Sequence, residues 1–248
     1  FHVPEEKRTV WMEEALEHAL QICAEKGLGE EATDAYTMER MKRIGQRTAW
    51  ALMEQLRKGN FAPEKTEVSF RNLEQLPSVS VLLSEDERMR LKGRIDRVDI
   101  CREQGNVYVR VIDYKSGSTR FDLTSVYYGL QLQLAVYLNA AMEMEQRDST
   151  GEVHPAGMSY YHIEDPMLDY EEEEDTERRM LKELAFNGLV NADPEVVKLM
   201  DKELHGSSDI LPIRLKKDGT YTAASSVAEE QELLRLSRHV NRKLTEYG

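Results

Sequence analysis

The stretch GRIDRVDICREQGNVYVRVIDYKSG, residues 93–117, contains two short apolar runs separated by a polar turn. Runs of this kind predict strands, and the turn REQGN is short enough to join them as an antiparallel hairpin. Asp96 lies near the start of the first run, and Asp113 and Lys115 lie at the end of the second. Because buried charges are costly unless they are paired or bind a metal, the open end of this hairpin is a candidate functional site.

Side chains alternate between the two faces of a strand, so Asp113 and Lys115 lie on one face. The hairpin brings Asp96 within one or two residue pairs of Asp113. Two carboxylates this close repel each other unless a cation lies between them. A divalent ion such as Mg²⁺ takes oxygen ligands and keeps several waters, which leaves room for a phosphate. The pattern favours metal-assisted phosphodiester hydrolysis, in which Lys115 neutralises charge or orients water.

The same charges also have an ordinary structural interpretation. Asp and Lys on neighbouring strands often form an exposed, ion-paired face, and Asp-any-Lys is a short pattern. Asp96 could pair with Arg94 or Arg97. Asp99 could form a surface pair with a neighbouring cation in the same way. The apolar run VYVRVI before Asp113 argues for a site instead, since it predicts a central strand that is at least partly buried.

The rest of the chain predicts further strands and a set of helices. The expected helices span residues 4–26, 33–58, 123–146, 176–186, 194–204 and 227–246. The expected strands are EKTEVSF (64–70), SVSVLL (78–83), RLKGRIDRVDI (90–100), NVYVRVIDYK (106–115) and GMSYYHI (157–163). We expect the first four strands to form one antiparallel meander, and LPIRLKKDGTY (211–221) to add a small hairpin at an edge.

Gln133 falls inside or beside the apolar stripe of the helix expected over 123–146, a stripe that includes Leu130, Leu134 and Tyr137. The stripe faces the sheet, so the Gln133 amide is expected to be buried and to need partners. It could bond backbone groups, or it could reach an attacking water or a phosphate.

Composition limits the class of protein. Hydrophobic residues make up 40% and charged residues 32% of 248 residues, which is typical of a rather helical globular protein, and we favour one domain. No run approaches the length of a membrane-spanning helix, and the N-terminus has no secretory signal, so an intracellular protein is expected. Cys23 and Cys101 lack metal-ligand spacing and are expected to be free thiols.

The net charge of −13 would ordinarily argue against a polyanionic partner. The charge is unevenly spread, however. DYEEEEDTE (169–177) carries seven negative charges and predicts a solvated loop that leads into a helix, whereas RMRLKGRIDR (88–97) carries five basic residues and one acidic residue. A basic strip on an acidic body would still allow DNA binding.

Three motifs occur in order on a strand, a strand and a helix: GRID (93–96), DYKSG (113–117) and QLAVY (133–137). Together they resemble the RecB-type branch of the PD-(D/E)XK nucleases, and most closely the C-terminal nuclease domains of the AddB family. The resemblance extends over LMEQLRKGNFAPEKTEVSF (52–70), YYHIEDP (160–166) and LPIRLKKDGTYTAASSVAEEQE (211–232). It therefore covers nearly the whole chain.

The resemblance implies an α/β (α+β) fold with a restriction-endonuclease-like core, in which helices flank a mixed central sheet and extra helices lie at both ends. It implies a single nuclease domain over 1–248. Its expected parts are N-terminal helices (1–62), the catalytic sheet and helix (63–163) and a C-terminal helical extension (164–248).

The resemblance also implies roles for individual residues. Asp96 and Asp113 would be ligands of Mg²⁺ or Mn²⁺, and Lys115 would be the catalytic lysine. Gln133 and Tyr137 would form the third motif. The supporting candidates are Glu67, which matches a family glutamate, and Gln131, and the candidates for the family's helix-borne histidine are His2 and His18.

AddB-type proteins are subunits of bacterial AddAB helicase-nucleases, which process DNA double-strand breaks for recombination. The resemblance implies a cytoplasmic deoxyribonuclease domain that cuts single-stranded DNA supplied by an AddA-like helicase, without membrane contact. Family proteins typically hold a 4Fe-4S cluster on four cysteines. Cys23 and Cys101 match none of those places, so no cluster is expected in this chain, which is interpreted as an excised domain or as a member without the cluster. The alternatives are a catalytically inactive structural or DNA-guiding module, and a small-molecule phosphatase or other metal hydrolase.

Overall fold

The computed structural model describes residues 5–25, 32–84, 87–168 and 175–247. The chain divides into two compact units, one made of Phe1–Arg57 with Ile163–Leu184 and the other of Lys58–His162 with Ala185–Gly248. No helix within the described ranges is long and apolar enough to cross a membrane. The expectation of a single domain stays a prediction.

Three helices are described in the first unit. These are α1 (Glu5–Glu25), α2 (Ala32–Lys58, whose last residue falls in the second unit) and α5 (Thr176–Glu183). Leu16 of α1 packs closely against Gly45 of α2, where a Cβ atom would lie 2.6 Å from the leucine side chain. Asp165 receives ion pairs from Arg43 and Arg47, which connect the segment around residue 165 to α2. The predicted helices over 4–26 and 33–58 are confirmed within a few residues.

The acidic tract over 169–177 lies mostly outside the described residues. Asp175 is described, and its carboxylate accepts hydrogen bonds from the backbone N–H groups of Glu177 and Arg178. An acidic N-cap favours the first turn of a helix, so the end of the tract starts α5 as expected.

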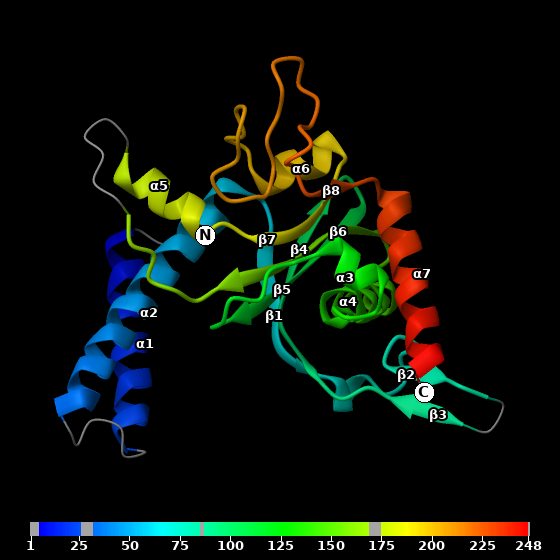
Figure 1. The fold of residues 1–248 in the computed structure, drawn as a ribbon, viewed down its shortest axis with the longest axis horizontal. Helices are drawn as coiled ribbons and strands as arrows, with labels where there is room; N and C mark the ends of the chain where they lie inside the picture. Colours follow the sequence, from blue (N-terminus) through cyan, green and yellow to red (C-terminus); the bar gives the residue numbers. More distant parts are fainter. Residues whose placement is uncertain (1–4, 26–31, 85–86, 169–174, 248) are drawn as a thin grey trace. The chain divides into compact units, whose positions relative to one another are not determined.

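The second unit contains a six-stranded sheet in the order β1-β4-β5-β6-β7-β8 (Figure 1). Its strands are β1 (Ala62–Ser69), β4 (Arg94–Glu103), β5 (Asn106–Lys115), β6 (Glu152–His162), β7 (Asn187–Asn191) and β8 (Val227–Ala228). Neighbours pair antiparallel except β5 with β6 and β7 with β8. The sheet is therefore mixed, as predicted. The parallel pairing of β5 with β6 requires a crossover connection.

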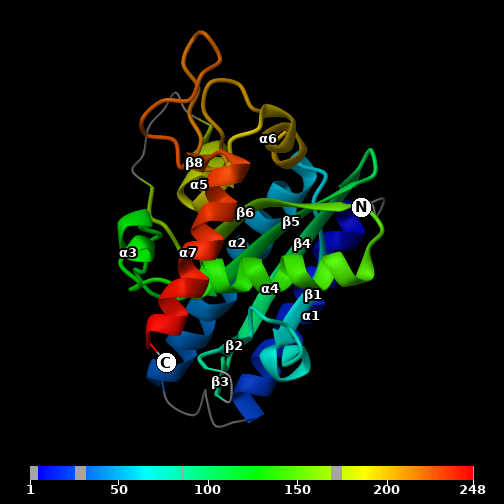
Figure 2. The same ribbon diagram turned by 90° about the vertical axis from the view of Figure 1, so that its right-hand side faces the viewer.

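The other helical elements of the described chain are η1 (Phe70–Leu73), α3 (Leu123–Tyr127), α4 (Gln133–Asp148), α6 (Pro194–Met200) and α7 (Glu230–Tyr247). The crossover contains α4, which packs on one face of the sheet, and α7 packs across α4 (Figure 2). The core between sheet, α4 and α7 is apolar, and it includes Val98, Val111, Leu134, Ala141, Leu233 and Val240. The order helix, three main strands, helix, strand is confirmed, and it positions both the hairpin and the third motif.

The β4–β5 hairpin has the tightest possible connection. Glu103 pairs with Asn106, and the two residues between them, Gln104 and Gly105, have φ angles of 51° and 84°. Two central residues with positive φ define the type I′ turn, whose twist matches that of the flanking strands. The predicted hairpin is confirmed, and the turn fixes its register.

Two of the predicted strands are wrong in their pairing or length. The run SVSVLL does not join the main sheet, because β2 (Ser80–Leu82) pairs with β3 (Arg88–Arg90) in a separate two-stranded sheet. The predicted strand 90–100 is interrupted at residues 91–93, which separate β3 from β4. The small hairpin over 211–221 is confirmed by the antiparallel bridge between Leu215 and Tyr221.

The single helix predicted over 123–146 is wrong, since α3 ends at Tyr127 and α4 begins at Gln133. Gly129 has a φ of 84°, a left-handed conformation that ends a helix. Leu130 continues the apolar spacing but is 79% exposed, because the break turns it away from the core. The helix predicted over 227–246 included β8, a strand of two residues, and α7 begins only at Glu230. The helices predicted over 176–186 and 194–204 are confirmed but shorter, since they end at Glu183 and Met200.

Gly188 on β7 lies close to the backbone of β6. A Cβ atom at this position would lie 2.0 Å from the Met158 carbonyl oxygen of β6. Gly188→Ala is therefore expected to lower the free energy of unfolding by roughly 3 kcal/mol, the upper end of the cost of overpacking. Urea unfolding would measure this. Gly117→Ala is the matched control, because a Cβ atom there meets nothing within 4 Å, and equal stability of the two variants would contradict the prediction.

Candidate active site

The two strands of the hairpin bring Asp96 and Asp113 together. Arg97 pairs with Ile112, and one further step of this antiparallel register places Asp96 opposite Asp113, on the same face of the sheet. The Asp96 carboxylate also accepts a hydrogen bond from the backbone N–H of Tyr114 (2.9 Å). The predicted convergence of the two carboxylates is thus present, and a backbone contact holds Asp96 in place.

Asp113 and Lys115 form a partly buried ion pair. Lys115 Nζ lies 2.6 Å from Asp113 Oδ2, and the two side chains are 25% and 4% exposed. The Oδ2 atom is buried, and the Lys115 ammonium is the cation that contacts it. Burial raises the pKa of Asp113, and the charge of Asp96 adds to this, while Lys115 opposes it. Lys115 thus supplies one positive charge beside the two carboxylates.

The third motif reaches Lys115 from α4. Lys115 Nζ donates a hydrogen bond to Gln133 Oε1 (2.9 Å), and Gln133 Nε2 donates to the Tyr137 hydroxyl (2.9 Å). Tyr137 is buried and packs edge-to-face on Phe70 with ring centroids 5.5 Å apart. Gln133 itself is exposed, so its predicted burial is wrong: it lies in the first turn of α4, beyond the apolar stripe. Its amide contacts two side chains rather than backbone groups.

Tyr160 is a site residue that the sequence reasoning missed. It lies on β6 directly opposite Asp113 in the parallel register, and its ring centroid is 5.2 Å from Lys115 Nζ, within cation–π range. Burial and the neighbouring charge of Asp113 raise the pKa of Tyr160. The Tyr160 side chain therefore borders the site as a neutral group. Strand β6 was predicted, but its parallel register with β5 depends on the crossover connection, and no local sequence pattern indicates which residues lie opposite each other.

The supporting candidates, Glu67 and Gln131, lie at the edge of the site. Glu67 of β1 has a positive φ of 55° and forms an ion pair with Arg94 across to β4. Gln131 bonds the backbone of Arg120 and Asp122 instead of reaching toward Lys115. Through these contacts both residues stabilise neighbouring segments of the chain.

Of the two histidine candidates, His18 is exposed on α1 of the first unit, and His2 lies outside the described residues. His162 occupies the register position opposite Lys115, and its Nε2 atom contacts the Thr119 carbonyl oxygen (2.6 Å).

The residues present fit a hard divalent cation. Among the described residues no group of three or more His, Cys, Asp or Glu side chains is placed to hold a metal ion. Two carboxylates are nevertheless the protein contribution that Mg²⁺ commonly has when it keeps waters and binds substrate phosphate. Asp96 and Asp113 are the residues that could hold it.

Asp99 is not the surface pair that the sequence suggested. It is fully buried on the opposite face of the hairpin, where Arg97 binds both of its oxygens (2.5 and 2.8 Å) and Arg110 donates to Oδ2 (2.6 Å). The Arg110 guanidinium also lies over the rings of Phe61 and Phe186, 5.1 and 4.9 Å from their centroids. The pairing of Asp96 with Arg94 or Arg97 is excluded as well, because Arg94 pairs with Glu67 and Arg97 with Asp99.

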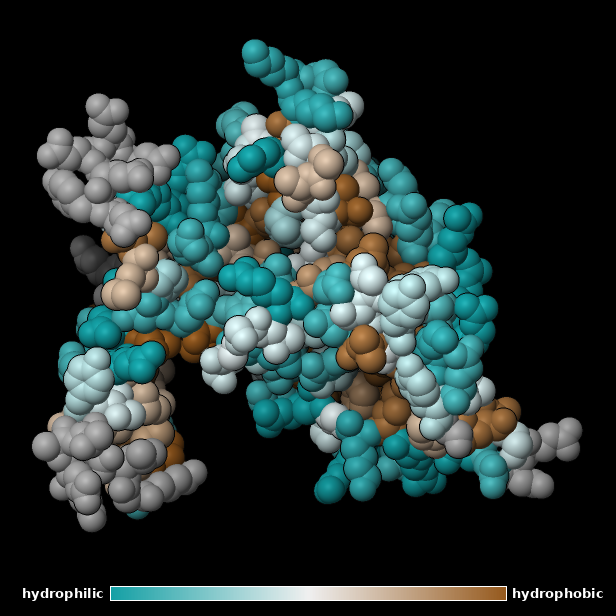
Figure 3. All heavy atoms as spheres, in the orientation of Figure 1, coloured by the Kyte–Doolittle hydropathy of each residue, from teal (hydrophilic) through white to brown (hydrophobic). Residues whose placement is uncertain are grey.

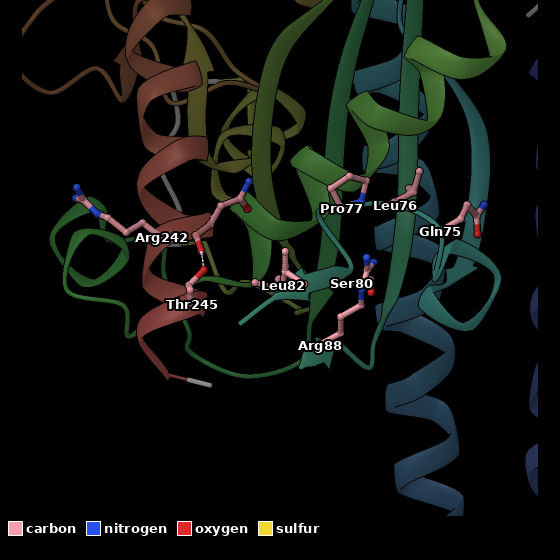
Figure 4. Close-up of a pocket in the computed structure, with 10 residues that line it drawn as sticks. Gln75, Leu76, Pro77, Ser80, Leu82, Arg88, Arg242 and Thr245 are labelled. Atoms are coloured by element: carbon pink, nitrogen blue, oxygen red, sulfur yellow. Dashed lines mark hydrogen bonds between the residues drawn. The ribbon is translucent and has the colours of Figure 1, made fainter. Parts of the chain in front are cut away.

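A pocket of about 470 Å³ lies apart from the carboxylates, between the segment around β2 and β3 and the last turns of α7 (Figure 4). Its lining residues include Gln75, Ser80, Leu82, Arg88, Asn241 and Thr245. None of the residues assembled around Lys115 lines it.

The fold and the site agree with what comparison of the sequence shows: the chain belongs to the PD-(D/E)XK nuclease superfamily, whose family model matches residues 2–247. The resemblance recognised in the three motifs is confirmed. Similar proteins, each named as a subunit of an ATP-dependent helicase/deoxyribonuclease, occur in Lachnoclostridium phytofermentans (42% identity over 96% of this chain and 20% of that protein), Alkaliphilus oremlandii (40%, 86% and 19%) and Clostridium novyi (38%, 94% and 21%). The chain spans about a fifth of the length of these relatives.

Proposed function

We propose that the chain is a deoxyribonuclease module that hydrolyses phosphodiester bonds of single-stranded DNA with Mg²⁺ or Mn²⁺. The observation that carries the proposal is the convergence of Asp96, Asp113 and Lys115 on one face of the β4–β5 hairpin. A solely structural ion pair would have no need of a second carboxylate.

Each residue has a distinct task in this proposal. Asp96 and Asp113 would hold the divalent ion, which when bound supplies Lewis-acid stabilisation and a more acidic water. The Lys115 ammonium donates hydrogen bonds to a phosphate oxygen as negative charge develops there. Gln133 accepts a hydrogen bond from one N–H of Lys115 and so fixes the direction of the other two, and its own hydrogen bond to Tyr137 holds the Gln133 amide in place. Gln133 and Tyr137 are therefore positioning residues.

The names of the relatives support a place within a larger assembly. Because those proteins are named as one subunit of a helicase/deoxyribonuclease, we propose that the module acts beside an AddA-like helicase subunit in the bacterial cytoplasm. The partner would supply the single strand, which suits a module whose net charge of −13 disfavours DNA binding.

The direct test is cleavage of labelled single-stranded DNA by the 248-residue chain with Mg²⁺ or Mn²⁺. We expect cleavage that EDTA and Asp113→Ala abolish. Asp148→Asn, which alters an exposed carboxylate on α4, should leave it unchanged. Calorimetric titration with Mn²⁺ should show binding that Asp113→Ala removes. A chain that neither cleaves DNA nor binds Mn²⁺ would contradict the proposal and favour an inactive structural or DNA-guiding module.

Gln133→Ala tests the positioning role. Loss of the acceptor for Lys115 frees the ammonium to rotate, and cleavage is expected to fall by roughly tenfold to a hundredfold while Mn²⁺ affinity stays unchanged. Gln131→Ala is the matched control, since this amide bonds only backbone groups of the preceding loop. Equal effects of the two substitutions would show that Gln133 has no special relation to Lys115.

A further inference from the structure

The outward face of α7 carries a row of arginines. Arg235, Arg238 and Arg242 recur at spacings of three and four residues, so they lie on one side of the helix, opposite the buried Leu233 and Val240. Arg235 and Arg238 have no ion-pair partner among the described residues, and Arg242 lies 4.0 Å from the Glu246 carboxylate one turn further on. Figure 3 shows hydrophilic side chains along α7 on the right of the view. This is a local basic surface on a chain of net charge −13.

An exposed aromatic pair lies beside this row. Tyr127 and Tyr128, at the end of α3, are 59% and 63% exposed and contact each other edge-to-face. The Tyr127 ring stacks in parallel on His239 of α7, with centroids 4.8 Å apart and planes 4° apart. Arg242 donates to the same histidine (2.9 Å) and extends away from the other side chains of the nearby pocket (Figure 4). The aromatic pair therefore lies against the middle of the arginine row.

The conformation of the pair is fixed by several contacts. His239 Nε2 bonds the Tyr127 carbonyl oxygen (2.8 Å), and the Tyr247 hydroxyl donates to the Tyr128 carbonyl oxygen (3.2 Å). Gly129 then reverses the chain toward Gln133, so the segment that presents the tyrosines continues directly into the third motif. A surface with exposed rings on a fixed backbone is preorganised for binding.

We infer that Tyr127, Tyr128 and the α7 arginine row form a binding surface for single-stranded DNA. Unstacked bases lie against the two tyrosine rings, and Arg235, Arg238 and Arg242 contact the phosphates. Aromatic faces accept any base, and arginines along the backbone path add affinity that falls with salt. Duplex DNA keeps its bases stacked within the helix and cannot use the rings. The inference rests on the proposed function, because it supplies a path for the strand that the site would cut.

Binding in EDTA separates this surface from the chemistry. Fluorescence polarisation would follow the 248-residue chain with a labelled thymidine oligonucleotide of about 15 nucleotides, long enough for several stacking contacts. Tyr127→Ala with Tyr128→Ala is expected to weaken binding at least about tenfold, the loss of a base–aromatic stack. The corresponding Phe variants should keep the affinity. Changing the three arginines to Gln should lower the slope of log affinity against log salt by about 2.

Two sets of control variants lie elsewhere on the chain. Tyr36→Ala removes an exposed tyrosine of α2, and Lys216→Gln with Lys217→Gln removes exposed charges of the 211–221 hairpin. Both should bind as the unmodified chain does.

The outcomes distinguish this inference from the proposed function. Unchanged affinity in the Tyr and Arg variants, equal loss in the Phe variants, or no binding by the unmodified chain at low salt would each overturn the inference. A chain that binds through this surface but cuts no DNA would contradict the proposed function alone. A chain that cuts DNA while the variants bind normally would contradict the inference alone. That result would favour a protein partner as the ligand of this surface.

Discussion

Replacing Lys115 with Met is expected to reduce cleavage of single-stranded DNA by roughly a hundredfold to a thousandfold, the range seen when one preorganised donor is removed from a transition state. The ammonium is held by Asp113 and Gln133 and lies against the Tyr160 ring, so the substitution removes a donor whose position these contacts fix. Mn²⁺ binding should persist, because Asp96 and Asp113 remain. Single-turnover cleavage and calorimetry on the same preparation would measure the two effects.

Lys58→Met is the matched control for this substitution. Lys58 forms an ion pair with Glu203 (2.5 Å) in the second unit, and like Lys115 it has a largely buried side chain. Its helix, α2, carries none of the site residues. Loss of Lys58 should leave cleavage unchanged. Loss of Mn²⁺ binding in Lys115→Met would contradict the assignment of metal binding to Asp96 and Asp113 without Lys115.

Asp99→Asn is expected to lower the free energy of unfolding by about 3–5 kcal/mol at neutral pH, the cost of breaking a buried ion pair. The substitution leaves Arg97 and Arg110 buried without a counter-charge, and the two rings over Arg110 offset only part of that cost. Urea unfolding would measure the difference. Glu74→Gln, which removes the exposed pair with Arg90 (3.0 Å), is the matched control and should cost less than about 1 kcal/mol.

The effect of Asp99→Asn should also depend on pH. Burial opposes ionisation of Asp99, but the charges of Arg110 and Arg97 outweigh it and hold the pKa below its ordinary value. A lowered folded-state pKa gives stability that is present above the ordinary value of 3.8 and lost as the pH falls through the lowered one. The difference between wild type and variant should therefore narrow in acid. A constant difference would argue that lost packing, not charge, causes the effect.

The hairpin and its carboxylates could be predicted because their determinants are local. Alternation fixes which side chains share a face, and a two-residue turn fixes the register, so Asp96 and Asp113 had to meet. The same register places Asp99 opposite Arg110. Arg110, the arginine inside the run VYVRVI, therefore indicated a partner for Asp99 within the buried hairpin. Because Asp99 has charged neighbours in the sequence, a surface pair was nevertheless the simpler interpretation.

The features that could not be predicted depend on distant parts of the chain. The parallel register that brings Tyr160 to Asp113 is set by the length and packing of the crossover through α4. The break between α3 and α4 has only Gly129 as its signal, and the apolar spacing runs on through Leu130. A single glycine within a helical pattern is compatible with a continuous helix, and here the packing of α7 against both helices selects the break.

The two-residue turn of the β4–β5 hairpin also bears on the order in which the protein assembles. Hairpins close within microseconds, whereas a crossover must first overcome the entropy of closing a longer loop. Asp96 and Asp113 would thus meet before α4 delivers Gln133 and before β6 covers them with Tyr160. Because Lys115 lies two residues from Asp113 on the same strand, the repulsion between the carboxylates is offset within the hairpin itself from the moment it forms.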